Sequence, residues 1–308
     1  MKNFKELAER LRVNRTLRVG IVACDQLSLQ AVFSSQVAAW VTPVLIGDVS
    51  QIRQWLTDLD YSADMIIAAE SPEEASRLAV NLVRAGQLDC LMKGNLHSST
   101  FLKAIVSKQS GLKNQQLLCH VALNEIPAYH KLLLTCDGGM LRQPSLAEKQ
   151  QLIMRSYEVM QALGVTTPKI ALLSAAETLD PKLSASMEAA ELSKKFKAQG
   201  LQIAGPISLD LSVSQESAKL KAYHDPVAGE ADILIGPDII TMNVLGKSLT
   251  VFAGAKMAGV ILGAQVPIVM TSRGSSIEEK VNSLLLALYC SKEEKNEDFG
   301  DQSRFNFH

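Results

Sequence analysis

A short polar segment near the C-terminus carries side chains suited to binding an anion. Residues 271–276 offer several hydroxyl groups and one guanidinium. The apolar run 267–270 before them is too short for a helix and predicts a buried strand. From Ile277 on, apolar residues recur at the spacing of one helical face, which predicts a helix. Because a helix start offers unpaired N–H groups and the positive end of a dipole, the segment predicts a site for a phosphate or an oxyanion.

Individual roles follow from the side chains of this segment. Arg273 is the residue we expect to hold a phosphate, since a guanidinium binds such groups through two parallel hydrogen bonds. Thr271 belongs to the same expected site, and Ser272 is expected to donate a hydrogen bond to a substrate oxygen, with a turn-forming or capping role as the alternative. Ser276, followed by Glu279 three residues later, matches a capping box.

Two further apolar runs, both predicted as buried strands, also end in polar residues. Lys93 and Gly94 follow one, and Asp137 follows the other. A cation beside a glycine can bring backbone close to a phosphate, and Lys103 on the next predicted helix would reach the same anion. Asp137 would orient a bound group or close a turn. Since ligands of open α/β sheets gather at the carboxyl ends of strands, we expect these ends to converge with residues 271–276.

Strand and helix patterns alternate along the chain, which predicts an α/β fold with a mostly parallel sheet. The apolar runs 117–122 and 132–135 are separated by too few residues for a crossover helix, so they predict an antiparallel pair. The largely apolar stretch 243–262 predicts a buried helix. A long helix over 145–163 predicts the crossing into a second domain.

The expected division therefore has two α/β domains and a tail. The first is discontinuous, with residues 1–143 and 266–290, and the second covers residues 144–265. Residues 291–308 are polar and of mixed charge, and they predict a loose C-terminal tail.

Composition narrows the class of protein. The chain has 308 residues, is 47% hydrophobic and has a net charge of -1, so nothing in its bulk charge favours nucleic acid or a membrane surface. Five dispersed cysteines, no apolar leader and no stretch long enough to span a bilayer predict a cytoplasmic location. The sequence lacks the G-x-G-x-x-G fingerprint, a Walker A loop and clustered metal ligands, so no metal site is expected.

Taken together, several segments resemble the phosphate acetyltransferase and phosphate butyryltransferase family, and they are closer to its butyryl branch. Each segment alone is a weak signal, but their order along the chain is specific. They are Leu91–Gly94, Phe101–Ala104, Cys119–Val121, Leu134–Asp137, Asp225–Gly229, Ala231–Leu234, Asn243–Leu249, Phe252–Lys256 and Pro267–Arg273.

The resemblance implies an architecture and an activity. The architecture would be that of isocitrate and isopropylmalate dehydrogenases, with a cleft between two α/β domains, in a homodimer. The activity would be reversible transfer of a short acyl group between coenzyme A and inorganic phosphate. Coenzyme A would be a substrate, and neither a metal nor another cofactor would take part.

The same resemblance bears on individual residues. It implies that Asn243 and Lys247, four residues apart on one helical face, line the cleft. The acetyl branch has a catalytic aspartate where this chain has Glu279, so Glu279 is either the general base or only the partner in the capping box. Lys103 stands where the family usually has arginine, and Leu141 replaces a usual polar residue. These departures leave the acyl chain open between butyryl, acetyl and similar groups.

Two other readings stay open. A metal- and NAD-dependent hydroxy-acid dehydrogenase would share the architecture, but it needs clustered aspartates, and those of this chain are dispersed. A coenzyme A-binding protein with little turnover would fit the substitutions at Lys103 and Leu141.

Overall fold

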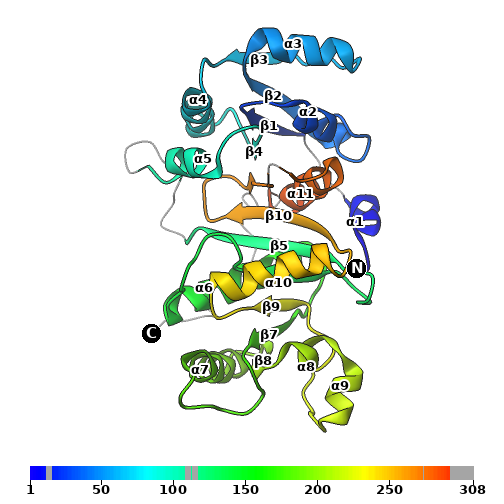
Figure 1. Cartoon of the computed structure of the whole chain (residues 1–308), viewed down its shortest axis with the longest axis vertical. Coiled ribbons are helices and arrows are strands. Elements are labelled where there is room, and N and C mark those ends of the chain that lie inside the picture. The colour runs from blue at the N-terminus through cyan, green and yellow to red at the C-terminus, as the bar shows by residue number, and fades with distance from the viewer. Residues whose placement is uncertain (12–15, 108–111, 113–116, 273, 292–308) are drawn as a thin grey trace.

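The computed structural model describes residues 1–11, 16–107, 112, 117–272 and 274–291. One sheet of 11 strands runs the length of the described chain, with the order β3-β2-β1-β4-β11-β10-β5-β6-β9-β7-β8, and helices cover its two faces (Figure 1). The α/β class with mostly parallel strands is therefore confirmed. No helix in the described residues is both long and apolar enough to cross a membrane.

The N-terminal half of the sheet is parallel. Its strands are β1 (Leu17–Val22), β2 (Val41–Gly47), β3 (Met65–Ala68) and β4 (Cys90–Lys93). The helices of this half are α1 (Phe4–Arg10), α2 (Gln26–Val32), η1 (Ala38–Trp40), α3 (Val49–Asp58), α4 (Pro72–Arg84) and α5 (Ser98–Ile105). Helices α2 and α3 share one core cluster, while α4 and α5 share another, so the two pairs cover opposite faces.

The centre of the sheet is antiparallel. Its strands are β11 (Ile268–Val269), β10 (Lys256–Leu262), β5 (Cys119–Glu125) and β6 (Leu133–Cys136). β10 runs antiparallel to both of its neighbours, and β5 pairs antiparallel with β6 as the short connection predicted. Helix α11 (Ile277–Cys290) follows β11 and is buried from Lys280 to Tyr289, where it packs on β10 and α2.

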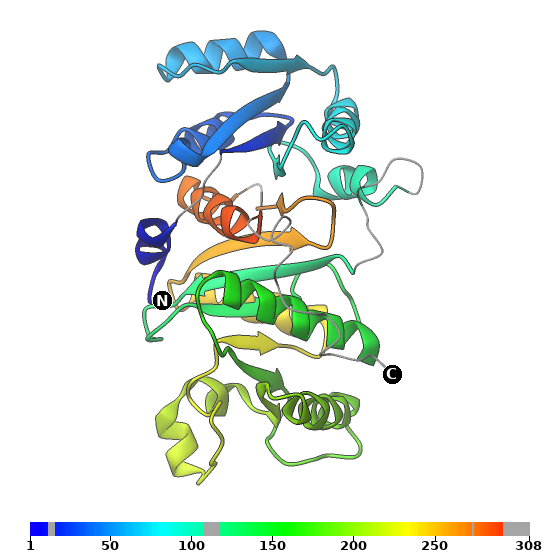
Figure 2. The ribbon, with the colours of Figure 1, turned by 180° about the vertical axis from the view of Figure 1, so that it is seen from behind.

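The C-terminal half returns to parallel pairing. Its strands are β9 (Ile233–Ile235), β7 (Lys169–Leu173) and β8 (Gln202–Ile207). Its helices are α6 (Leu146–Ala162), α7 (Ser184–Ala198), α8 (Leu209–Val213), α9 (Gln215–Leu220) and α10 (Ile239–Val251). Figures 1 and 2 show α10 in front of this half of the sheet and α6 behind it.

The prediction of one buried helix over 243–262 is wrong. Helix α10 ends at Val251, and Gly254 adopts a φ of 63° in the turn that leads into β10. Such a left-handed conformation suits glycine and breaks the helix. Helix α10 is also not packed inside, since Met242 is its only buried residue. The stretch is apolar throughout, so its periodicity did not separate a surface helix from a central strand.

Candidate active site

Two of the three predicted strand ends meet at one edge of the sheet. β4 and β11 are parallel neighbours, with Leu91 opposite Ile268 and Met92 opposite Val269. Lys93 and Thr271 therefore leave the sheet on the same side. β1 pairs with the other side of β4, so its carboxyl end joins them.

This edge lies at the point where the chain connections change direction. The loop after β1 leads to α2 on one face, and the loop after β4 leads to α5 on the opposite face. In open α/β sheets, a crevice at such a switch point is the usual place for a ligand. The position of β11 beside β4 brings the polar segment after Val269 to that place.

The third strand end does not join the other two. Three successive antiparallel pairs separate β11 from β6, so β6 runs in the opposite direction and Asp137 leaves toward the other edge. The predicted convergence was wrong for Asp137 because it took no account of β10. The Asp137 carboxylate accepts hydrogen bonds from the backbone N–H groups of His120, Gly139 and Met140, at 2.9, 2.7 and 2.8 Å. In this structure Asp137 closes a turn.

Lys93 and Gly94 are both enclosed by the fold. Lys93 is 1% exposed, and its Nζ donates hydrogen bonds to the carbonyls of Gly94 (3.2 Å) and Leu96 (3.0 Å). A Cβ on Gly94 would lie 2.2 Å from the carbonyl oxygen of Ala23, so only glycine allows β4 to approach the end of β1 this closely. The ammonium of Lys93 is thus fixed just below the switch point.

The segment after β11 forms the expected helix start. Ser276 is the N-cap of α11, and its Oγ accepts the N–H of Glu279 at 3.1 Å. The Glu279 carboxylate binds the Ser275 hydroxyl at 2.7 Å, which differs from the capping box that the spacing predicted. Burial raises the pKa of the Glu279 carboxyl, although the Ser275 hydrogen bond and the charge of Lys280 oppose this. Arg273 lies outside the described residues, and Ser272 is exposed.

Sequence reasoning missed Lys280, the next residue along α11. It is 3% exposed, and its Nζ donates to Thr271 Oγ1 at 3.2 Å. Burial lowers the pKa of its ammonium, while the negative charges of Asp25 and Glu279 favour the charged form. The signal was available, because Lys280 lies three residues before the buried Ser283 and on the helical face of the buried Leu284.

The remaining predicted residues lie elsewhere on the fold. Lys103 is exposed on α5. Asn243 and Lys247 are exposed on α10, and Asn243 Nδ2 donates to the Gly138 carbonyl at 3.0 Å. Asn243 is therefore next to the turn that Asp137 holds, so the predicted residues form one group around β4 and β11 and a second around β6 and α10.

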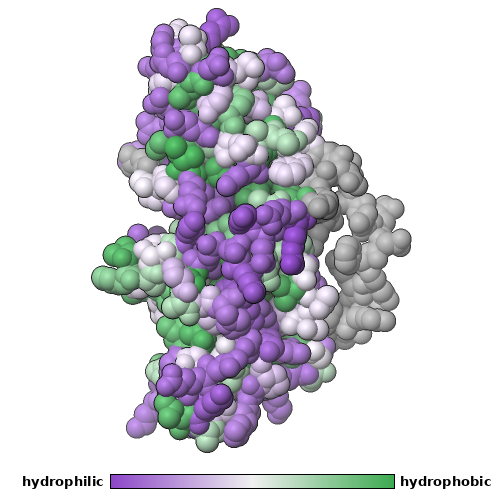
Figure 3. Space-filling model, turned by 90° about the vertical axis from the view of Figure 1, so that its right-hand side faces the viewer, coloured by the Kyte–Doolittle hydropathy of each residue, from purple (hydrophilic) through white to green (hydrophobic). Residues whose placement is uncertain are grey.

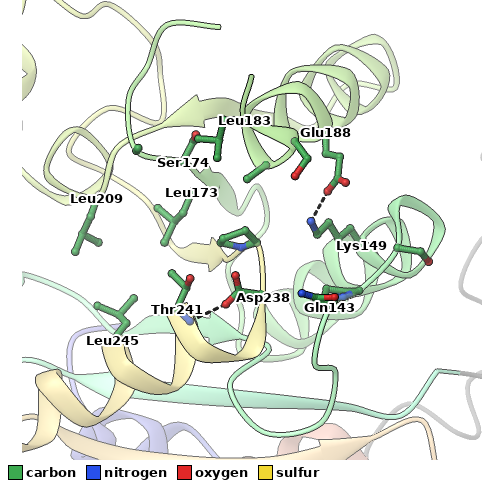
Figure 4. Close-up of a pocket in the computed structure, with 16 residues that line it drawn as sticks. Gln143, Lys149, Leu173, Ser174, Leu183, Glu188, Leu209, Asp238, Thr241 and Leu245 are labelled. Atoms are coloured by element: carbon green, nitrogen blue, oxygen red, sulfur yellow. Dashed lines mark hydrogen bonds and ion pairs between the residues drawn. The ribbon is translucent and has the colours of Figure 1, made fainter. Parts of the chain in front are cut away.

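A cavity of about 800 Å³ opens beyond the carboxyl ends of β7 and β9 (Figure 4). Four leucines line it, together with the ion pair between Lys149 and Glu188. Its leucines are Leu173, Leu183, Leu209 and Leu245. None of the predicted site residues lines this cavity. In the described residues, including those that line the cavity, no three His, Cys, Asp or Glu side chains are grouped so as to hold a metal ion.

Comparison with known proteins decides the family. Residues 52–288 match the model of the family described as "Phosphate acetyl/butaryl transferase". The chain belongs to this family. A probable phosphate butyryltransferase of Bacillus subtilis is 40% identical over 81% of this chain and 85% of its own length. A phosphate acetyltransferase of Thermotoga maritima is 39% identical over 86% of this chain and 92% of its own length.

Solved structures give the same picture of the fold. A branched-chain phosphotransacylase from Enterococcus faecalis is similar with a TM-score of 0.78 and 34% identity, over 90% of this chain and 99% of that one. A 4-hydroxythreonine-4-phosphate dehydrogenase from Burkholderia phymatum has a TM-score of 0.54 at 13% identity, over 90% of this chain and 98% of that one, and shows the fold alone. The expected dehydrogenase-like architecture is thus confirmed, together with the resemblance to the phosphate acyltransferase family.

Proposed function

We propose that this protein is a phosphate acyltransferase, which moves a short acyl group reversibly between coenzyme A and inorganic phosphate in a ternary complex. Family membership over residues 52–288 is the observation that carries the proposal. The polar helix start after β11, placed at the switch point of the sheet, supports it with a site of suitable chemistry.

The reaction places three demands on the site. The thiol of coenzyme A loses its proton to a base, and the thiolate sulfur bonds to the carbonyl carbon of the acyl phosphate. The bond from that carbon to the phosphate oxygen then breaks, and phosphate leaves with the electron pair. The site must therefore take up a proton, hold a phosphate, and stabilise the charge on the carbonyl oxygen.

Specific residues meet these demands in the proposal. Arg273 holds the phosphate, and Ser272, exposed before the start of α11, donates to the carbonyl or phosphate oxygen. Thr271, Lys93 and Gly94 shape the same end of the sheet. Glu279 accepts the thiol proton, and its raised pKa brings it nearer to the pH at which a base works best. Lys103, Asn243 and Lys247 contribute contacts to coenzyme A.

The cleft would lie between the two proposed domains, residues 1–143 with 266–290 and residues 144–265. In this arrangement Asn243 and Lys247 of α10 would contact coenzyme A from the side of the second domain. Asp137 would then act by holding the turn to which Asn243 binds.

We further propose that the enzyme works as a homodimer in the cytoplasm. The outer face of α10 supports self-association, since Ile240 and Val251 are each 72% exposed and Phe252 is 86% exposed. Figure 3 shows apolar side chains protruding at the level of this helix. An exposed group of large apolar side chains such as this one usually marks a contact surface with another protein. All five cysteines are free thiols, which fits a reducing compartment.

The acyl chain is the open part of the substrate. The two relatives named above carry butyryl and acetyl names at nearly equal identity. We propose butyryl or a chain of similar length, with acetyl as the alternative, and no cofactor beyond coenzyme A as substrate.

An acyl-coenzyme A panel tests the proposal. Purified protein is mixed with phosphate and acetyl-, propionyl-, butyryl- or isobutyryl-coenzyme A, and thiol release is followed. We expect phosphate-dependent release with at least one of them. Absence of release with all four would refute the proposal, and tight coenzyme A binding in that case would favour a binding protein with little turnover.

A further inference from the structure

Lys280 is a buried cation that the proposed reaction does not yet use. It lies below the carboxyl end of β11, and its Nζ donates to Thr271 Oγ1 at 3.2 Å. An ammonium has three N–H donors. Among the described residues, the Thr271 hydroxyl is its one hydrogen-bond acceptor, and no carboxylate forms an ion pair with it.

The surroundings of Lys280 make this arrangement costly. Asp25, whose charge reaches it, caps α2 by accepting the N–H of Ser28 at 2.7 Å. Glu279 accepts the Ser275 hydroxyl. Both carboxylates thus serve other groups. A buried ammonium without an ion pair lowers the stability of the fold, and this cost points to a functional role for Lys280.

Thr271 is the group through which Lys280 would act. Thr271 is 4% exposed, and its oxygen accepts the ammonium hydrogen. A hydroxyl that accepts from a cation has its own hydrogen left to donate. In the described part of the chain that hydrogen has no acceptor, and Thr271 directly precedes the exposed Ser272.

We propose that Lys280 is a positioning residue for phosphate, which fixes the Thr271 hydroxyl so that its hydrogen is donated to the phosphate of the substrate. The inference rests on the proposed function. In this arrangement the Thr271 hydroxyl is a neutral hydrogen-bond donor, polarised by the buried Lys280 ammonium, at the switch point between β1 and β4. A purely structural role, tying α11 to β11, is the alternative.

Three variants separate the two roles. Lys280→Met removes the charge with little change in volume, and we expect little loss of stability because burying an unpaired charge is itself costly. Thr271→Val removes the hydroxyl, and Thr271→Ser restores it. Lys256→Met is the matched control, because Lys256 is an exposed lysine paired with Glu278 next to the same helix start.

KM for phosphate and KM for acyl-coenzyme A are measured for each variant, with the phosphate-induced rise in Tm. We expect Lys280→Met and Thr271→Val each to raise KM for phosphate about 10- to 100-fold, the factor of one charge-assisted hydrogen bond. KM for acyl-coenzyme A stays near that of the wild type, and Thr271→Ser recovers most of the loss. The double variant should be no worse than either single variant, since both changes break one connected pair.

The opposite pattern overturns the inference. If Lys280→Met and Thr271→Val change Tm but keep the wild-type KM for phosphate and the wild-type rise in Tm with phosphate, Lys280 is only structural. Failure of the proposed function looks different. If the proposed function is wrong, the wild type releases no thiol from acyl-coenzyme A. The phosphate-induced rise in Tm of the variants can still be compared with that of the wild type, so the role of Lys280 in phosphate binding remains testable.

Discussion

Replacing Glu279 by glutamine separates the two roles that its position allows. Glutamine keeps an acceptor for the Ser275 hydroxyl and leaves the N–H of residue 279 on Ser276 Oγ. It removes only the ability to take up a proton. The change therefore tests the base without removing the cap, and Glu278→Gln is the matched control, since Glu278 is an exposed neighbour paired with Lys256.

The expected effect on rate is large. A positioned general base contributes about 10²- to 10⁴-fold, which corresponds to roughly 3–5 kcal/mol of barrier. We expect kcat of Glu279→Gln to fall within this range while both KM values change little. Glu278→Gln should lose less than about twofold, because exposed ion pairs contribute little.

Glu279→Gln should lower the rate but should not lower the stability of the fold at neutral pH. Burial raises the pKa of Glu279 above its ordinary 4.5, so the folded state binds the proton more tightly than the unfolded chain. The resulting stabilisation is present below pH 4.5 and disappears as the pH rises through the folded pKa. At neutral pH the glutamine variant should therefore be at least as stable as the wild type, as measured by urea unfolding at pH 4 and pH 7.

The pH profile completes the test. Wild-type kcat should fall on the acid side as Glu279 is protonated, at a pH above the ordinary value of a glutamate, and this limb should vanish in Glu279→Gln. A variant with wild-type kcat and an unchanged acid limb would refute Glu279 as base and leave it a helix-start residue.

Three further predictions concern stability and assembly. Gly94→Ala should lower the free energy of unfolding by about 1–3 kcal/mol, because its Cβ would meet the Ala23 carbonyl at 2.2 Å, and Gly246→Ala, with open space around it, should not. Asp137→Asn should cost roughly 2–4 kcal/mol in urea unfolding, since all three of its backbone donors lose a charged acceptor and at least one of them then faces the amide NH2 group. Phe252→Asp should yield a monomer by light scattering if α10 forms the dimer interface. Leu220→Asp, at another exposed apolar residue, should not change the mass.

Much of the local structure was predictable because its causes are local. Ser276 accepts the N–H of Glu279, three residues later, so this capping residue marked the start of α11 correctly. The helix predicted over 145–163 is α6, which begins after the N-cap Ser145. The short connection between β5 and β6 likewise fixed their antiparallel pairing.

The pairing of distant strands was not predictable in this way. β11 reaches β4 across more than half of the chain, and no local pattern records that contact. β10 was hidden because an apolar stretch suits a central strand as well as a helix. That single omission reversed the inferred direction of β6, and with it the expected position of Asp137. Lys280 was missed for a different reason: a lysine is normally exposed, although its position on the buried face of α11 indicated otherwise.

The charges at the switch point explain why phosphate should bind there in either direction of the reaction. Two lysines, Lys93 and Lys280, are buried below the ends of adjacent strands, and Lys93 is held by carbonyl dipoles. Buried positive charge of this kind is costly in the free protein, and an anion at the helix start would offset part of that cost. Inorganic phosphate and the phosphate of an acyl phosphate gain the same stabilisation. The site therefore does not by itself favour one direction, and substrate concentrations would set it.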